Sequence, residues 1–298
     1  MNWNIAIKDY QTFLKIERGL SINTINSYTN DLEKLSKFLS ENEISISPIA
    51  IDETVIQQFI YDAAKKINAR SQARLISGLK SFFEYLVFED YRKTNPTDLI
   101  EAPKIGRKLP DTLSEEEIDA LIGAIDLSHP QGERNRTILE TMYSCGLRVS
   151  EVITLKISDL FFDEGFIRVL GKGNKERFVP IHTQAQKFIQ SYINVIRIHE
   201  KPQKNHEDTL FLNRRGKGLT RQMIFMMINE NATKINLKKK ISPHTFRHSF
   251  ATHLLKYGAD LRAIQQMLGH ESITTTEIYV HLDKSYLREV VETYHPRR

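Results

Sequence analysis

The stretch SPHTFRHSFATHLLKYGADLRAIQQMLGHESITTTEIY, residues 242–279, brings arginine, histidine and tyrosine side chains into one short segment. Ser242 followed by a proline predicts the start of a helix, because serine caps helices well and proline suits their first position. His244 and Arg247 then lie three residues apart and share one helix face. Gly258 predicts the end of this helix. Its apolar side is expected to consist of Phe246, Phe250, Leu254 and Tyr257.

A second helix is expected to begin after Asp260, an N-cap residue, and to end at Gly269, so that His270 lies at the turn. Tyr279 follows on a further short helical segment. These residue types together suit a phosphodiester substrate. Arginine binds phosphate oxygens with two parallel hydrogen bonds, histidine moves protons near neutral pH, and tyrosine can be a covalent nucleophile.

Two other interpretations of the histidines remain open at this point. A single histidine on a helix is most often an ordinary core or surface residue. His244 and His248 are also four residues apart, a spacing found in zinc sites. No carboxylate lies between them, however, and Arg247 would place a positive charge beside the ion, so the ligand types do not favour a metal.

The composition sets further limits. The chain has 298 residues, room for about two domains, and 42 Lys and Arg against 37 Asp and Glu give a net charge of +5. This small excess favours a polyanionic partner only slightly.

The single cysteine, Cys145, excludes an internal disulfide and is interpreted as a small core residue. No apolar run approaches the ~18 residues of a membrane span and the N-terminus does not resemble a signal peptide, so we expect a cytoplasmic protein.

Residues 1–100 are expected to form a small helical bundle, because their apolar residues recur at helical spacing and no segment alternates like a strand. Ser21 and Asp52 are expected to cap the second and third helices, and a fourth helix is expected over residues 71–88. The outward face of the fourth helix carries three basic residues, Arg70, Arg74 and Lys80. They are either a solvated surface or contacts to DNA phosphates.

Residues 101–112, EAPKIGRKLPDT, lack periodicity and are interpreted as a basic linker to a second domain, residues 113–298. That domain opens with a capping box at Ser114. Arg148 follows a glycine that ends a helix, and Ser150 is expected to cap the next one. The neighbouring Glu151 is interpreted as a packing carboxylate rather than a catalyst.

Two strand-like runs, residues 166–170 and 176–181, surround the segment GKGNK and predict a β-hairpin. Lys172 at its tip is either a solvated turn lysine or a group that enters a DNA groove. Lys239 lies in a basic triplet and is either solvated or a phosphate contact. A helix from about residue 220 to 235 carries three methionines that are expected to lie in the core: Met223, Met226 and Met227.

Several of these motifs together resemble the tyrosine recombinase (phage integrase) family. HTFRHSFATHLL, LGH and the late Tyr279 resemble its most characteristic region, CGLRVSE its first arginine motif, and GKGNKERFVPI its β-hairpin lysine motif. Within the family the chain most resembles the Xer recombinases of bacterial chromosome-dimer resolution, and the resemblance covers nearly the whole chain. It implies a mainly α fold with a small β-sheet or hairpin. An N-terminal helical core-binding domain would precede a tyrosine recombinase catalytic domain, whose C-terminal helix docks onto a neighbouring protomer.

The resemblance implies six catalytic residues: Arg148, Lys172, His244, Arg247, His270 and Tyr279. Tyr279 would attack the scissile phosphate and become linked to the DNA 3′ phosphate. The two arginines would neutralise the transition state, helped by a hydrogen bond from the histidine of LGH. His244 is the candidate base, and Lys172 the candidate acid for the leaving 5′ hydroxyl. The phosphotyrosine conserves the bond energy, so the resemblance implies no cofactor, no metal and no ATP.

The sequence departs from the family pattern at three positions outside these six: Phe246, where leucine is usual, Glu271, where a small residue is common, and Val280, after the nucleophile. None of them removes a chemical function. A carboxylate beside His270 bears on the pKa of that histidine.

The implied partner is double-stranded DNA with a specific recombination site, here a dif-like chromosomal site used in cell division. Two duplexes that exchange strands imply four protomers, either identical or paired with a second Xer-type recombinase, acting on the cytoplasmic nucleoid. For Xer proteins an FtsK translocase is a further candidate partner. The rival interpretations are a mobile-element integrase, a type IB topoisomerase, a DNA-binding protein with an inert site and a zinc hydrolase. The target sequence and the order of strand exchange are left open.

Overall fold

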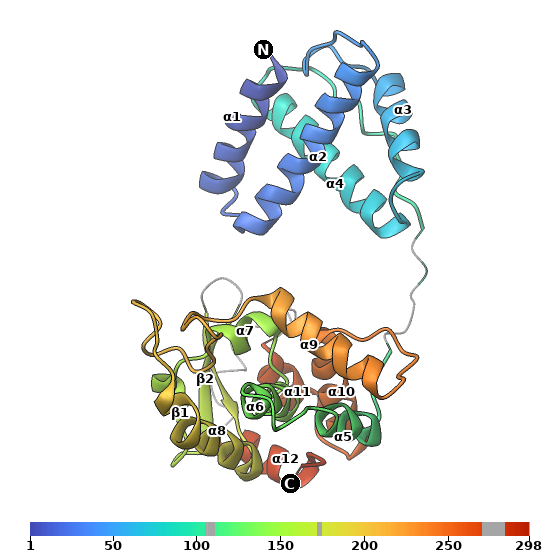
Figure 1. Cartoon of the computed structure of the whole chain (residues 1–298). Coiled ribbons are helices and arrows are strands. Elements are labelled where there is room, and N and C mark those ends of the chain that lie inside the picture. The colour runs from blue at the N-terminus through green and yellow to red at the C-terminus, as the bar shows by residue number, and fades with distance from the viewer. Residues whose placement is uncertain (105, 107–110, 172–174, 270–283, 298) are drawn as a thin grey trace. The chain divides into compact units, whose positions relative to one another are not determined.

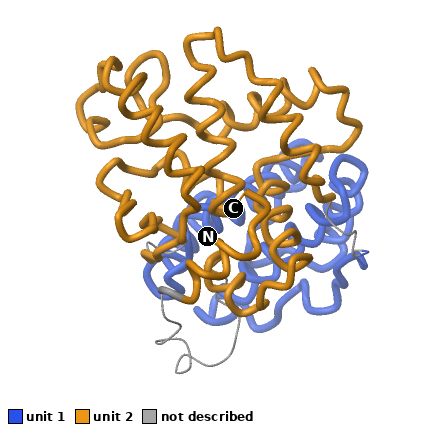
Figure 2. The backbone as a smooth tube through the Cα atoms, turned by 90° about the horizontal axis from the view of Figure 1, so that it is seen from below, with its two compact units in different colours: residues 1–108 blue, residues 109–298 orange. Residues whose placement is uncertain are grey.

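The structure, a computed structural model, describes residues 1–104, 106, 111–171, 175–269 and 284–297. The chain divides into two compact units, residues 1–108 and 109–298, which Figure 2 shows in separate colours. The predicted linker, residues 101–112, spans this division, and its ends stay a prediction.

Within its described residues the first unit consists of four helices (Figure 1): α1 Trp3–Ile16, α2 Ile22–Glu41, α3 Glu53–Ala64 and α4 Ala69–Phe88. Each begins after a residue whose side chain accepts a hydrogen bond from the first turn, as predicted for Ser21 and Asp52. The fourth helix begins at residue 69 rather than 71, because Asn68 caps it. Tyr10 and Phe82 are fully buried between the helices, with their ring centroids 5.3 Å apart.

The second unit is mainly helical around a small sheet (Figure 1). Its helical elements are α5 Glu115–Gly123, α6 Gly132–Ser144, α7 Val149–Thr154, η1 Ile157–Asp159, α8 Thr183–Val195, η3 Arg197–His199, α9 Arg221–Lys234, α10 Pro243–Lys256, α11 Leu261–Leu268 and α12 Lys284–Tyr294. Strands β1 Leu160–Phe161, β2 Phe166–Leu170 and β3 Glu176–Pro180 form an antiparallel sheet in that order. The predicted hairpin is confirmed, with Val169 opposite Arg177, and so is the predicted fold class.

The core of the second unit is built around α6, whose Leu139 and Met142 are fully buried. Helix α10 packs against α6 through the apolar side that its sequence predicted, because Phe246, Phe250 and Leu254 are each 0% exposed. Tyr257, expected on the same side, is 43% exposed, since it lies at the C-cap beyond the last helical turn.

The prediction that α9 buries three methionines is wrong for two of them. Met227 is 8% exposed, whereas Met223 is 38% and Met226 52% exposed. The helix buries the face that carries Ile224, Met227 and Ile228, and the other two methionines lie outside that face. Helical spacing shows which residues share a face but not which face meets the core.

The C-terminal helix α12 packs on its own unit. Leu287, Val290 and Val291 are at most 4% exposed and belong to the same hydrophobic core as α6 and α10. His295 follows the helix and is 1% exposed, with its ring centroid 5.0 Å from that of Tyr143. Docking of this helix onto a neighbouring protomer therefore stays a prediction.

The buried position of His295 predicts a pH dependence of stability. Burial lowers the pKa of His295 to about 3, although the carbonyl of Tyr143 opposes this effect. The unfolded chain then binds a proton between pH 6.5 and about 3 that the folded chain does not. The contribution of His295 to the unfolding free energy is therefore fully present well above pH 6.5. It is lost as the pH falls through this window, by at most about 1.4 kcal/mol per pH unit.

His295→Leu is expected to reduce the slope of the unfolding free energy against pH between pH 7 and pH 5. Urea unfolding followed by circular dichroism measures this slope. The slope does not vanish, because burial also lowers the pKa of His182 and of His253. The first unit provides an internal control, since the single tryptophan of the chain, Trp3, reports its unfolding by fluorescence. An unchanged slope in His295→Leu would contradict the assignment.

Candidate active site

Arg148 is positioned by the turn between α6 and α7. Helix α6 ends at Ser144 with Cys145 as its C-cap, and Gly146 follows with φ +58°, a left-handed conformation that favours glycine. A Cβ atom at Gly146 would lie 2.4 Å from the Phe250 ring, so the turn also requires glycine for space. The prediction that Ser150 caps the next helix is wrong. Arg148 is the N-cap, because its extended backbone directs its N–H to the carboxylate of Glu151, 2.8 Å away.

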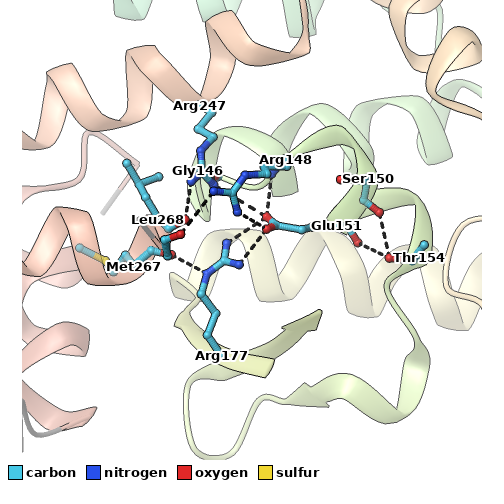
Figure 3. Close-up of polar contacts among 10 residues, drawn as sticks. Gly146, Arg148, Ser150, Glu151, Thr154, Arg177, Arg247, Met267 and Leu268 are labelled. Atoms are coloured by element: carbon cyan, nitrogen blue, oxygen red, sulfur yellow. Dashed lines mark hydrogen bonds and ion pairs between the residues drawn. The ribbon is translucent and has the colours of Figure 1, made fainter. Parts of the chain in front are cut away.

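Glu151 lies at the centre of three guanidinium groups (Figure 3). Its Oε1 accepts hydrogen bonds from Arg148 Nη1 and Arg177 Nη1, each at 2.7 Å, and its Oε2 accepts one from Arg177 Nη2 at 2.9 Å. Arg247 Nη1 lies 3.8 Å from Oε2. The carboxylate is 2% exposed, so these contacts replace its hydration. Glu151 is thus a packing carboxylate, as predicted, and it gathers the arginines.

The same three arginines contact successive carbonyl groups at the end of α11 (Figure 3). Arg177 Nε donates to the Met267 carbonyl at 2.9 Å, Arg247 Nη2 donates to that of Leu268, and Arg148 Nη2 lies 3.4 Å from that of Gly269. Carbonyls at a helix C-terminus lack partners within the helix and carry partial negative charge. Each guanidinium therefore helps to fix this helix end relative to α7 and the hairpin.

The cluster retains a net positive charge. Burial would raise the pKa of Glu151, but hydrogen bonds and charge from Arg177, together with hydrogen bonds from Arg148, outweigh burial and hold the pKa below its ordinary value. Burial and the neighbouring Arg148 lower the pKa of Arg247 to about 9, so this guanidinium remains charged at neutral pH. One carboxylate among three cations leaves two uncompensated positive charges, which suits an anionic ligand.

The structure brings together two of the six predicted catalytic residues. A third lies on the same helix, α10, as one of these two. Arg148 and Arg247 flank Glu151, with their side chains 27% and 8% exposed. His244 is exposed in the first turn of α10, one turn before Arg247. The other three, Lys172, His270 and Tyr279, lie outside the described residues.

A metal site is not supported in the described part of the chain. Among the residues that the structure describes, no group of three or more His, Cys, Asp or Glu side chains is arranged to hold a metal ion. The zinc interpretation of His244 and His248 thus gains no further ligand from the described residues.

The four predicted DNA contacts occupy different environments. Arg70 is exposed in the first turn of α4, and Lys80 is half-buried near its middle. Arg74 forms an ion pair with the buried Asp31 of α2 through two hydrogen bonds, at 2.5 and 2.9 Å. Lys239 bonds to the carboxylate of Glu117 at 2.7 Å and to the Thr112 carbonyl. Their contacts to DNA stay predictions.

Arg74 has a structural role that can be measured. Asp31 is fully buried, so Arg74→Met would leave a carboxylate in the core with Lys34 as its neighbouring cation. We expect a loss of about 2 kcal/mol in unfolding free energy, less than for a fully buried pair because the Arg74 side chain is 41% exposed. Urea unfolding followed by Trp3 fluorescence measures this loss. Arg70→Met is the control and should change stability by less than about 0.5 kcal/mol.

Comparison with known proteins decides the family. The sequence matches the model of the "Phage integrase family" over residues 111–285 and that of the "Phage integrase, N-terminal SAM-like domain" over residues 7–90. The chain belongs to the phage integrase family. Its first unit contains the SAM-like core-binding domain and its second unit the integrase catalytic domain, which confirms the predicted family and makes the chain a tyrosine recombinase, a site-specific DNA recombinase.

Individual phage integrase family members are similar over most of the chain. The tyrosine recombinase XerD of Staphylococcus saprophyticus subsp. saprophyticus is 46% identical over 98% of each chain. The XerH site-specific recombinase, in a pre-cleavage complex with its difH substrate, is 26% identical with a TM-score of 0.69, covering 95% of this chain and 83% of that one. A lambda integrase tetramer on a Holliday junction, 18% identical with a TM-score of 0.73 and covering 95% and 80%, shares the fold alone.

Arg177 was not among the site residues predicted from the sequence, although it belongs to the β-hairpin lysine motif of the family. It lies on β3, within GKGNKERFVPI, and its side chain is 14% exposed. The sequence did offer one signal for it: an arginine in a strand next to apolar positions that are expected to be buried. Such an arginine requires a hydrogen-bonding partner. Its partner, Glu151, is 26 residues away in the sequence, and only the packing of the hairpin on α7 reveals the pair.

In the described part of this phage integrase family member, no helix is both long and apolar enough to cross a membrane.

Proposed function

We propose that this tyrosine recombinase exchanges DNA strands at a dif-like chromosomal site and resolves chromosome dimers during cell division. The observation that carries the proposal is the buried cluster in which Arg148 and Arg247 retain positive charge around one carboxylate. Two similarities support the dif-like target. A relative named XerD is 46% identical over 98% of its length, and XerH is similar in its complex with difH.

The arginine cluster suits the transition state of phosphoryl transfer. Attack on a phosphodiester gives a pentavalent arrangement with additional negative charge on the non-bridging oxygens. Arg148 and Arg247 neutralise this charge from preorganised positions, because Glu151 and the end of α11 hold both side chains. The Arg148 side chain is the more exposed of the two and is the one that a phosphate reaches first.

The remaining roles follow the family resemblance. The Tyr279 phenol attacks the phosphorus and forms a bond to the DNA 3′ phosphate, and the bond to the 5′ oxygen breaks. Tyrosine has a reference pKa of about 10, so a base assists the attack, and the exposed His244 takes this role. Lys172 protonates the leaving 5′ oxygen, and His270 donates a hydrogen bond to the phosphate. Attack by a 5′ hydroxyl of the partner strand then releases the tyrosine and rejoins the DNA.

Strand exchange between two duplexes requires four cleavages, so the active assembly is a tetramer of identical protomers or of two Xer-type recombinases. The basic side chains of Arg70, Arg74, Lys80 and Lys239 contact phosphates of the site. The reaction takes place on the chromosome in the cytoplasm, with an FtsK translocase as a candidate partner.

A nicked duplex that carries the dif-like site of the encoding chromosome tests the proposal. The nick lets the short cleaved strand diffuse away, so the covalent intermediate accumulates. With EDTA present, we expect a protein–DNA band that survives a denaturing gel and that a duplex of scrambled sequence does not give. Tight DNA binding without this band, also after addition of a second Xer-type recombinase, would contradict the proposal.

A further inference from the structure

Arg177 joins three parts of the catalytic unit through one side chain (Figure 3). It extends from β3, donates two hydrogen bonds to Glu151 of α7 and a third from Nε to the Met267 carbonyl of α11. A planar guanidinium with donors on several edges can satisfy both acceptors at once, whereas an ammonium group cannot hold this geometry. Arg177 is therefore fixed, and it fixes the elements that it contacts.

The side chain of Arg177 also lies against two glycines that precede predicted catalytic residues. A Cβ atom at Gly171, which precedes Lys172, would be 3.3 Å from Arg177 Nη1. A Cβ atom at Gly269, which precedes His270, would be 3.0 Å from Arg177 Cδ. The Gly171 N–H donates to the Lys175 carbonyl at 2.8 Å and closes the base of the hairpin. Arg177 thus packs where the chain enters both segments.

The charges around Glu151 give Arg177 a second effect. Arg177 makes a bidentate ion pair with the carboxylate, so it can compensate the negative charge by itself. The charges of Arg148 and Arg247 then remain available to an anionic ligand. Without Arg177, the buried carboxylate would need another cation, and Arg148, already 2.7 Å from Oε1, is the nearest.

We propose that Arg177 is a positioning residue for DNA strand cleavage: it compensates the charge of Glu151, which leaves the positive charges of Arg148 and Arg247 available to the scissile phosphate, and it holds the end of α11 against the hairpin. This inference rests on the proposed strand-cleavage function.

Two substitutions separate charge from geometry. Arg177→Met removes the charge and keeps much of the volume, and Arg177→Lys keeps the charge but not the bidentate geometry. We expect Arg177→Met to slow single-turnover cleavage of the nicked duplex by roughly 10- to 100-fold, the scale for groups that orient an active residue, with DNA binding within about twofold of wild type. Arg177→Lys should recover part of this loss. Arg168→Met is the control, since Arg168 lies on β2, the other strand of the hairpin, and forms an ion pair with Asp159.

A double variant provides a measurement that a general structural role does not affect. Glu151→Gln removes the charge that Arg177 compensates, so the rate losses of Glu151→Gln and Arg177→Met should not multiply in the double variant. If the two losses were independent, the double variant would lose the product of the two. We expect it to cleave at least tenfold faster than that, so that its loss is about as large as that of one single variant. Losses that multiply would overturn the coupling.

The outcomes distinguish this inference from the proposed function. A wild-type chain that forms no covalent complex overturns both. Normal cleavage by wild type, Arg168→Met and Arg177→Met together overturns the inference alone. Where Arg177→Met does not fold, judged by circular dichroism, Arg177→Lys decides: cleavage at the wild-type rate overturns the inference, and slower cleavage with retained DNA binding supports it.

Discussion

Tyr279→Phe is expected to abolish the covalent protein–DNA complex while DNA binding stays within about twofold of wild type. Phenylalanine keeps the ring but lacks the oxygen that the proposed mechanism bonds to the 3′ phosphate. Removing the nucleophile of a covalent mechanism costs roughly 10⁴-fold or more in rate, because the covalent bond can then no longer form. The measurement is the denaturing gel with the nicked duplex, over a time course long enough to detect that loss.

Tyr257→Phe is the matched control for this experiment. Tyr257 belongs to the same unit, is 43% exposed, and donates a hydrogen bond to Glu115 at 2.7 Å. Its loss should leave the covalent complex at the wild-type level. A covalent complex formed by Tyr279→Phe would show that another side chain is the nucleophile, and peptide mapping of the DNA-linked fragment would identify it.

Arg247→Gln is expected to have the second largest effect, a loss of roughly 10²–10³-fold in the cleavage rate, on the scale of removing one preorganised donor from a transition state. The guanidinium is 8% exposed, with Nη1 donating to the Gly146 carbonyl at 2.8 Å and Nη2 donating to that of Leu268. It is thus held in place before the proposed phosphate ligand binds, and its charge acts in surroundings with little water. Single-turnover cleavage of the nicked duplex measures the loss.

Arg247→Lys should recover little of this activity, because one ammonium group cannot reach the two carbonyls and the phosphate in the geometry of a planar fork. Both variants leave buried carbonyls with fewer donors, so the assays belong well below the melting temperature of each variant. Arg262→Gln, an exposed arginine on α11, is the control and should cleave at the wild-type rate. Equal rates for Arg247→Gln and wild type would remove Arg247 from the site.

The boundaries of α10 and α11 could be predicted from the sequence, whereas the start of α7 could not. Asp260 caps α11 through hydrogen bonds to two backbone N–H groups of its first turn, and Gly269 ends the helix with φ +63°. These residues lie within a few positions of the helix boundary that they set, so the local sequence is sufficient to predict it. The combination of motifs likewise determined the family. Lys172, His270 and Tyr279 lie outside the described residues, and their roles remain predictions.

Tertiary structure decided which charges meet. Arg74 was expected on an outward face of α4, but the packing of α2 against α4 places the buried Asp31 beside it. In the same way, Glu151, Arg177 and Arg247 come from α7, β3 and α10, and nothing in their local sequence selects one pairing over another. The sequence alone determined the helices, the family and the candidate residues, because those depend on neighbouring residues and motifs. The shared carboxylate and the role of Arg177 depend on contacts between distant segments, which exist only once the core has packed.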